Sequence, residues 1–213
     1  MTNFSPIRPA TDADVPYLYE ICLKTGHTGG DATSFFQNPY MLGSYWAAPY
    51  LHFNKELCFI AENKDGRPAG YIVGTRDTAQ YNNWLAQNWL PILQRHYAYL
   101  EPKNEKEKNL LAQIQKQTVG AGVWENIGYP AHLHIDLLPE LQGQGMGRRL
   151  IEAWLEKAKE LRVVGVHLGV SAHNTGAIGF YQHLGFSILE TKEHSITFGM
   201  KLHLKNSGST IAE

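Results

Sequence analysis

The chain has 213 residues, a length that suits one sizeable domain with room for an insertion. Hydrophobic residues make up 43% and charged residues 18%, and these values exclude a disordered chain. Lys plus Arg number 19 and Asp plus Glu number 20, so the net charge of -1 excludes a basic surface that would capture nucleic acid or an anionic membrane.

The N-terminal part of the chain predicts short strands and helices in alternation. Apolar residues between positions 15 and 22 repeat at intervals of three and four, which predicts a helix that ends before Gly26. A glycine-rich loop and an aromatic stretch follow this helix. The other elements expected here are a strand at 5–9, a broken helix within 34–53, and a hairpin of strands 57–62 and 69–75.

Residues 76–128 are rich in Trp and Tyr and differ in character from the rest. The helices expected within this segment are 81–99, kinked or split at Pro91, and 105–117. Trp84 and Trp89 are five residues apart, so an α-helix would not place them on one face. A segment of this size rarely buries a sufficient core alone. We therefore interpret it as an insertion and not as a separate domain. It could cap a pocket or form a homodimer face, and the alternative is that its aromatic residues pack in the core.

The C-terminal part of the chain predicts a strand-helix-strand crossover followed by a helix and a hairpin. The expected elements are strand 131–138, helix 145–161, strand 163–170, helix 175–184, strands 186–191 and 195–204, and a frayed polar tail at 205–213. The apolar run in 163–170 indicates a strand buried on both faces. The whole pattern predicts an α/β fold with a mixed sheet of about seven strands in one domain, residues 1–204.

The two cysteines, Cys22 and Cys58, are isolated in the sequence. This spacing excludes a disulfide framework or a CxxC pair and predicts buried structural thiols. The N-terminus has no apolar signal segment, and no window approaches the roughly 18 consecutive apolar residues of a membrane helix. We therefore expect a cytoplasmic protein without a membrane partner.

A glycine-rich run, QGQGMGRR at residues 142–149, lies between a predicted strand and the long helix. Glycines permit a tight turn and a close approach to a ligand, and a helix start presents free N–H groups at the positive end of the helix dipole. The run therefore predicts a cradle for phosphate or pyrophosphate. A Walker A loop is absent, and the dinucleotide fingerprint fails because Arg148 occupies the place of its last glycine. The pattern Q/R-x-x-G-x-G/A matches fully.

Four features of the C-terminal half occur in the order and approximate spacing of one superfamily. They are LLPE at 137–140, QGQGMG at 142–147, Asn174, and FYQHLGF at 180–186. The sequence thus resembles the GNAT superfamily of N-acetyltransferases, closely over 132–186 and more loosely over 5–202. It also has a looser similarity to bacterial GNAT proteins that look like the acetyltransferase-like domain of O-GlcNAcase. The insertion departs from the short connection that is usual in the family.

The resemblance implies a GNAT-like domain with acetyl-CoA as co-substrate and no metal. Strands 132–138 and 164–170 would splay apart to admit the thioester, and the glycine loop would hold the pyrophosphate through backbone N–H groups. The strand end would pair with the pantetheine arm. The cofactor-binding residues carried over are Leu137, Leu138, Gln142, Gly143, Gln144, Gly145, Met146, Gly147, Arg148, Asn174, Ala177 and Tyr181.

Acetyl transfer needs an oxyanion donor and an acid as well as a base. The resemblance implies the N–H of Leu137 or Leu138 as the oxyanion donor. It also implies Tyr181 as the acid that protonates the leaving thiolate, because a phenol is protonated at pH 7 and close in acidity to a thiol. The alternative is that Tyr181 is a packing residue of its helix.

The candidate base comes from the strand before the glycine loop. Side chains alternate along a strand, so His132, His134 and Asp136 should share one face. Asp136, or else His134, is the expected base or relay. The alternatives are structural partners for these groups and water as the base. The row also suggests a metal site, but His167 or His173 would have to complete it, and none is predicted.

Fewer features of the sequence indicate where the acceptor substrate binds. In this superfamily the first helices and the hairpins shape the acceptor site, and the loop that ends at Asp31 lies in that region. Asp31 could pair with an amine, and His132 is the second expected substrate-binding residue. The alternative for Asp31 is a solvated turn.

We therefore expect an acyl-CoA-dependent N-acyltransferase that moves acetyl to a primary amine by direct attack in a ternary complex. The acceptor would be a small molecule or a peptide. One alternative is a non-catalytic module that binds acetyl-CoA. Another is a metal-dependent oxygenase built on His132 and His134.

Overall fold

The computed structural model describes residues 6–116 and 123–203. Its sheet runs in the order β1-β2-β3-β4-β5-β7-β6. The strands are β1 (Ile7–Pro9), β2 (Phe59–Glu62), β3 (Pro68–Thr75), β4 (Ala131–Leu137), β5 (Gly165–Ser171), β6 (Ser187–Thr191) and β7 (Ser195–Lys201). Strands β4 and β5 pair in parallel, and the other neighbours pair antiparallel. The predicted mixed sheet of seven strands is confirmed.

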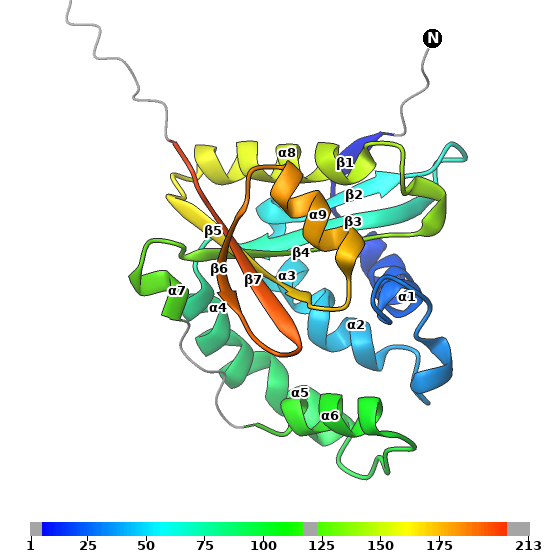
Figure 1. Cartoon of the computed structure of the whole chain (residues 1–213). Helices are drawn as coiled ribbons and strands as arrows, with labels where there is room; N and C mark the ends of the chain where they lie inside the picture. Colours follow the sequence, from blue (N-terminus) through cyan, green and yellow to red (C-terminus); the bar gives the residue numbers. More distant parts are fainter. Residues whose placement is uncertain (1–5, 117–122, 204–213) are drawn as a thin grey trace, which may run out of the picture.

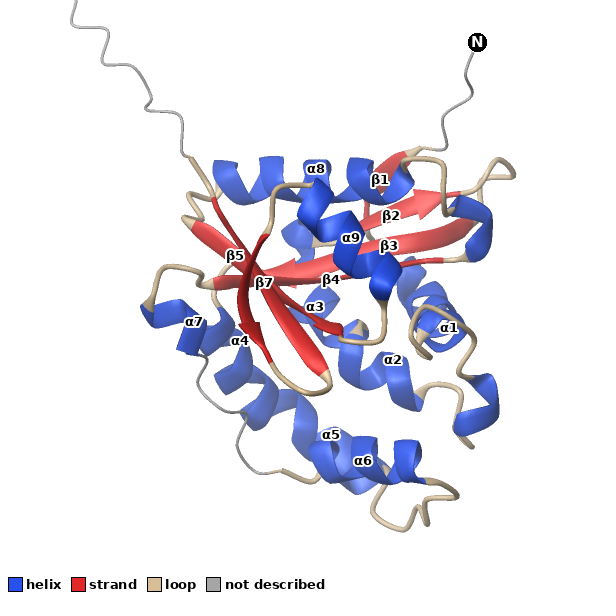
Figure 2. Cartoon of the chain, in the orientation of Figure 1, coloured by secondary structure: helices blue, strands red, loops and turns tan. Residues whose placement is uncertain are grey.

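Helices cover both faces of this sheet (Figures 1 and 2). They are α1 (Val15–Thr25), α2 (Met41–Trp46), α3 (Ala48–Phe53), α4 (Thr78–Trp84), α5 (Leu90–His96), α6 (Glu105–Ile114), α7 (Val123–Asn126), α8 (Met146–Glu160) and α9 (Thr175–His183). Figure 1 shows α8 along the top of the view and α5 and α6 at the bottom, with the sheet between them. Among the described helices, none combines the length and the apolar character that crossing a membrane requires.

Alternation along the strands creates two cores, one on each side of the sheet. Strand β4 shows this directly, because Ala131 and Leu133 are buried in the core under α8 and α9. The side chains at 132, 134 and 136 therefore face the opposite layer, which contains α1, α2 and α3. The core of that layer includes Tyr71 of β3 and Leu18 of α1. The predicted shared face of His132, His134 and Asp136 is thus oriented toward the first helices.

The parallel pair opens soon after it begins. Only Ala131 with Val166 and His132 with His167 are in register between β4 and β5. Beyond these positions β4 continues to pair with β3, while β5 pairs with β7 along its full length. The predicted splay between the two strands is therefore present, and it leaves a gap beside residues 133–137.

Strand β5 is less buried than its apolar sequence indicated. The first part of the strand is buried, but Gly169 is exposed and Val170 and Ser171 are only partly buried. The expectation of burial on both faces was wrong for this half. The reason is the splay, since β5 leaves β4 at the point where the gap opens.

The segment between β3 and β4 packs on the core of the first helices. Its buried residues Tyr81, Leu85, Leu90 and Leu110 belong to the same apolar cluster as Leu18 and Met41. An Asp77 carboxylate caps α4 by accepting from the N–H of Gln80 at 2.9 Å. The segment therefore extends the layer that carries α1 to α3.

The expectation that Trp84 and Trp89 lie on different faces was wrong. A π-helical turn (Leu85–Trp89) separates α4 from α5, and Pro91 sits in the first turn of α5. A π-turn closes after five residues, so positions five apart become neighbours. The two indole rings consequently stack, with centroids 6.0 Å apart.

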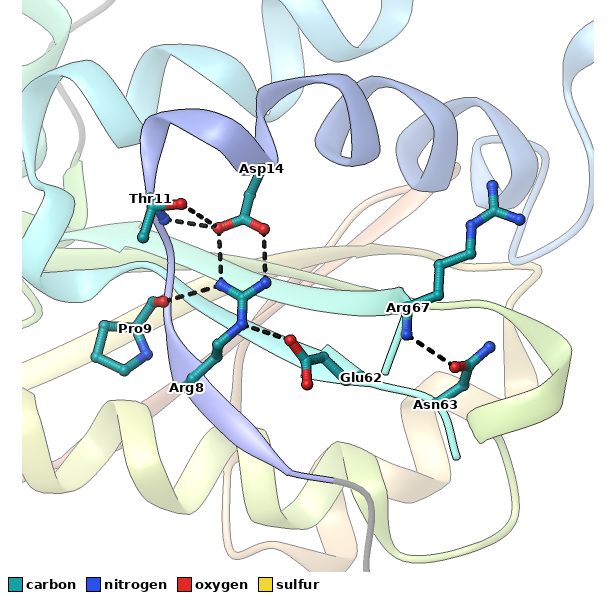
Figure 3. Close-up of polar contacts among 7 residues, drawn as sticks. All are labelled: Arg8, Pro9, Thr11, Asp14, Glu62, Asn63 and Arg67. Atoms are coloured by element: carbon teal, nitrogen blue, oxygen red, sulfur yellow. Dashed lines mark hydrogen bonds and ion pairs between the residues drawn. The ribbon is translucent and has the colours of Figure 1, made fainter. Parts of the chain in front are cut away.

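Arg8 ties the first strand to its neighbours (Figure 3). Its guanidinium donates two hydrogen bonds to the buried Asp14, at 2.7 and 2.8 Å, and one to Glu62 at 2.5 Å. The Asp14 carboxylate also accepts from the N–H and hydroxyl of Thr11. These contacts place the start of α1 against the sheet edge. Residues 1–5, 117–122 and 204–213, including the tail expected to fray, lie outside the described residues.

Candidate active site

A cavity of about 690 Å³ lies where the gap between β4 and β5 meets the starts of α8 and α9. All the expected cofactor residues line it except Leu138 and Gln144. The lining residues that sequence reasoning missed are Thr25, Thr28, Gly29, Ile135, Leu141, Gly176, Phe180 and His183. The helical spacing from Gly176 through Phe180 to His183 was a usable signal for three of these. The turn after α1 carried no such signal.

The floor of this cavity is the loop that begins α8. Gly143 and Gly145 have φ angles of 70° and 75°, a left-handed conformation that side chains rarely adopt. A Cβ at either position would extend into open space, with no protein atom within 4 Å. The first turn of α8 includes Met146, Gly147 and Arg148, and the N–H groups of these residues have no partner within the helix. The cavity therefore presents N–H donors at the positive end of a 15-residue helix.

The opposite wall comes from α9 and the turn after α1. Asn174 caps α9, since its Oδ1 accepts from the N–H of Ala177 at 3.1 Å. A Cβ added to Gly29 would lie 3.8 Å from Nδ2 of Asn174. Gly29 and Asn174, which are distant in the sequence, thus lie side by side in the lining of the cavity.

The ladder between β3 and β4 decides which N–H groups face the gap. Leu138 donates its N–H to the carbonyl of Ala69 at 2.8 Å. In an antiparallel ladder, alternate residues point their N–H groups to opposite sides. Ile135 and Leu137 therefore direct theirs away from β3 and into the gap. The N–H of Leu138 is therefore not available as the oxyanion donor, which corrects one of the two expected candidates. The N–H of Leu137 remains available.

Side chains of the glycine loop brace its ends. Gln142 donates from Nε2 to the carbonyl of Leu137 at 2.8 Å. Gln144 donates from Nε2 to the carbonyl of Glu140 at 2.7 Å, which explains why it does not line the cavity. Arg148 does line it, while its guanidinium lies 3.6 Å from Glu152 one turn further along α8.

Tyr181 reaches the same cavity from α9. Its ring packs against Phe186 and Phe198, and the residue is 8% exposed. Burial raises the pKa of the Tyr181 hydroxyl, and the charge of Asp136 adds to the effect. The phenol is therefore protonated at neutral pH and lies close enough to Asp136 to sense its charge.

A second cavity, of about 250 Å³, opens on the other side of β4. It is lined by residues of α1, α2 and β4, namely Cys22, Thr25, Gly26, Leu42, Trp46, His134 and Asp136. Asp136 and Thr25 line both cavities, so they lie where the two meet. The aromatic wall is Trp46, whose ring lies 6.3 Å from that of His134.

Three side chains converge on the Asp136 carboxylate. Tyr71 donates its hydroxyl to Oδ2 of Asp136 at 2.5 Å, and His134 places Nε2 3.0 Å from the same oxygen. Cys22 lies beside both Tyr71 and Asp136, and burial raises the pKa of its thiol. Both cysteines are buried as expected. However, the sequence did not indicate that Cys22 would lie next to the candidate base.

His132 lies deeper, away from both cavities. Thr78 donates its hydroxyl hydrogen to the carbonyl of Pro130, so Nδ1–H of His132 must donate to Thr78 at 2.8 Å. Nε2 then accepts from the Tyr50 hydroxyl at 2.7 Å. Burial, with the neighbouring His167 and His134, lowers the pKa of His132 to about 3. Its imidazole is therefore neutral with both nitrogens engaged, which contradicts a substrate-binding role.

Asp31 does not line either cavity. Its carboxylate accepts from Lys24 at 2.8 Å and from the N–H and hydroxyl of Thr33. These bonds, Lys24 first, lower the pKa of Asp31 to about 2. It caps a turn on the surface, so the expected role in substrate binding is not supported by its position.

The histidines named for a metal site are also dispersed. His167 donates a hydrogen bond from Nδ1 to the carbonyl of Tyr129 at 2.9 Å and lies near His132, whereas His173 lies near His194. Neither is grouped with His134 and Asp136. The cluster within the described residues is instead Cys22, His134 and Asp136, whose ligand atoms lie within 4.8 Å of one another.

Comparison with known proteins identifies the fold and the family. A family model described as the acetyltransferase (GNAT) family matches residues 78–186. The crystal structure of a protein named SsHAT is 34% identical, with a TM-score of 0.82 over 94% of this chain and 99% of that chain.

More distant structures share the fold. The ribosomal-protein-S18-alanine N-acetyltransferase from Escherichia coli is 18% identical, with a TM-score of 0.53 over 99% of this chain and 100% of that chain. A phosphinothricin acetyltransferase from Sinorhizobium meliloti, solved in complex with acetyl-CoA, is 14% identical, with a TM-score of 0.56 over 93% of this chain and 88% of that chain.

Proposed function

Because the chain belongs to the acetyltransferase (GNAT) family, we propose that it transfers an acetyl group from acetyl-CoA to a primary amine. The larger cavity would hold acetyl-CoA, with the pyrophosphate on the N–H groups at the start of α8. The open space at Gly143 and Gly145 supports this fit, because a side chain there would extend toward the ligand.

The observation that carries the proposal is the position of Asp136. This carboxylate lines both cavities, so it would face the thioester on one side and the acceptor amine on the other. A primary amine arrives largely protonated at neutral pH and must lose a proton before it can attack. Asp136 would receive that proton, and the hydrogen bond from the Tyr71 hydroxyl would hold its carboxylate in position.

The reaction then follows as direct transfer. The amine nitrogen forms a bond to the carbonyl carbon, the carbon–sulfur bond breaks, and RNH₂ plus acetyl-CoA yields RNH–COCH₃ plus CoA. The N–H of Leu137 points into the gap and would stabilise negative charge that develops on the carbonyl oxygen. Tyr181 would donate a proton to the sulfur, and Asp136 would take the proton from the attacking nitrogen.

The acceptor would enter through the smaller cavity. Its walls combine the apolar side chains of Leu42 and Trp46 with the carboxylate of Asp136. This composition suits a slender amine that carries apolar carbon next to its nitrogen. The amine could belong to a small molecule or to a peptide.

The test measures release of the CoA thiol with a disulfide reagent across a panel of amines. Asp136→Asn should lower turnover about 100- to 10,000-fold, the usual contribution of a general base, while acetyl-CoA affinity stays within about 3-fold. Asp65→Asn, in the exposed turn between β2 and β3, is the matched control and should behave as wild type. Tight acetyl-CoA binding with no thiol release for any amine would instead support the non-catalytic binding module.

A further inference from the structure

We propose that a zinc ion binds between α1 and β4 through Cys22, His134 and Asp136 and blocks the acceptor side of the site. The ligand atoms of these three residues lie within 4.8 Å of one another. Thiolate, imidazole and carboxylate are the three ligand types that zinc takes in proteins, and small side-chain shifts would bring these atoms to tetrahedral spacing.

A second observation points to a ligand at this place. Nε2 of His134 is buried and has no hydrogen-bond partner among the described residues. It lies 3.0 Å from Oδ2 of Asp136, but outside hydrogen-bond geometry. A buried polar atom without a partner is costly, and a metal ion at this point would satisfy it.

The surroundings supply the rest of a zinc site. Two anionic ligands, the Cys22 thiolate and the Asp136 carboxylate, would balance the charge of the ion. The hydroxyl of Tyr71 already donates to Asp136, and such outer hydrogen bonds orient metal ligands. The smaller cavity borders all three ligands, so it provides an entry path and room for a water molecule as the fourth ligand.

Binding exchanges a proton for the metal. The Cys22 thiol is protonated in the metal-free protein, and zinc takes its place as the thiolate forms: Cys–SH plus Zn²⁺ gives Cys–S–Zn⁺ plus H⁺. Asp136 would then hold the metal and could no longer accept a proton from the amine. Zinc should therefore inhibit in competition with the amine and without competing with acetyl-CoA. This inhibitory consequence rests on the proposed function, whereas metal binding itself does not.

The metal-binding test uses the full chain, freed of metal by a chelator and titrated with Co²⁺ and then with Zn²⁺. Co²⁺ should produce a thiolate-to-cobalt charge-transfer band that zinc abolishes. Cys22→Ser should remove the band and weaken zinc binding at least about 10-fold, the lower end of what loss of even an outer partner costs. Cys58→Ser is the matched control, because Cys58 is the other buried thiol and lies outside the cluster.

If Cys22→Ser fails to fold, judged by circular dichroism, His134→Gln provides the second variant and should weaken zinc binding in the same way. The absence of a thiolate band, or equal zinc affinity in wild type and both variants, would overturn the proposal. Inhibition is measured as the ratio of rates with and without zinc within each protein. A cobalt band in a protein without transferase activity would support the metal site and contradict the proposed function. Transferase activity without a cobalt band would support the proposed function and contradict the metal site.

Discussion

The larger cavity is lined mainly by one stretch of chain, from β4 to α9, whereas the smaller cavity gathers side chains from α1, α2 and β4. In the first, the groups that would meet the ligand are mostly backbone N–H donors of the loop before α8. In the second, they are the side chains of Cys22, Trp46, His134 and Asp136.

This difference has a physical basis. A backbone cradle needs only glycines and a helix start, and both leave a local pattern in the sequence. A cluster of side chains needs a particular packing of distant elements, and no local pattern records it. Cys22 and Asp136 illustrate the second case, because only the packing of α1 against β3 and β4 brings them together.

The largest expected effect tests whether the cradle is built from backbone. Gly145→Glu would place a carboxylate where phosphate should bind, and like charges at close range cost several kcal/mol. We expect acetyl-CoA affinity to fall at least about 100-fold, measured by isothermal titration calorimetry.

Gly66→Glu is the control for Gly145→Glu. Gly66 has a φ of 79° and open space around it, so the backbone strain is the same, but it lies in the β2–β3 turn away from the cavity. If both variants bind acetyl-CoA equally well, the assignment of the glycine loop is wrong.

The next effect tests Tyr181, a proposed reacting side chain that lines the larger cavity and not the smaller one. Tyr181→Phe keeps the ring packing against Phe186 and Phe198 and removes only the hydroxyl. We expect kcat to fall about 10- to 100-fold with little change in acetyl-CoA affinity, because a proton donor acts in the transition state. Tyr99→Phe, at a position 97% exposed, is the control. Equal losses in kcat and affinity would indicate a binding role for Tyr181.

A third prediction concerns the contact between α6 and the segment that precedes α2. Glu107 of α6 is fully buried and accepts hydrogen bonds from the N–H and the side chain of Gln37 and from the N–H of Lys103. Glu107→Gln would turn an amide NH₂ toward these donors, so we expect the free energy of unfolding to fall by about 1–3 kcal/mol at pH 7. Urea denaturation measures this, with exposed Glu105→Gln as the control.

The same residue predicts an acid effect. Burial alone would raise the pKa of Glu107, but the hydrogen bonds from Lys103 and Gln37 outweigh it and lower the pKa overall. Because the folded pKa lies below the unfolded value of about 4.3, the ionised form stabilises the fold above that pH. The stabilisation is lost as the pH falls through the folded pKa. The difference between wild type and Glu107→Gln should therefore shrink in acid, and a difference that grows would contradict this account.

The smallest expected effect tests whether the surface residue Asp31 belongs to the acceptor site. Asp31→Asn should leave the KM for the amine within about 2-fold of wild type, the range expected of a substitution away from the site. The reason is that Asp31 faces Lys24 and Thr33 and lines neither cavity. Steady-state kinetics with the best amine of the panel measure it, and a large rise in KM would place the acceptor path near Asp31.

The sequence by itself determined the order of the elements, the mixed sheet and the cradle for an anion. Hydrophobic periodicity located the strands and helices, and the glycine spacing before α8 located the loop, because these are properties of neighbouring residues. It also placed His134 and Asp136 on one face of β4, since alternation needs no tertiary information.

Only the tertiary structure decided the rest. The π-turn that stacks Trp84 on Trp89, the ladder bond that occupies Leu138, and the burial of His132 all depend on contacts between distant segments. The contact of Asp136 with Cys22 likewise depends on packing between distant segments. The local sequence does not determine which of several polar side chains takes which role. Hydrogen bonding and packing between distant segments decide this, and the groups around Asp136 come together only when α1 packs against β4.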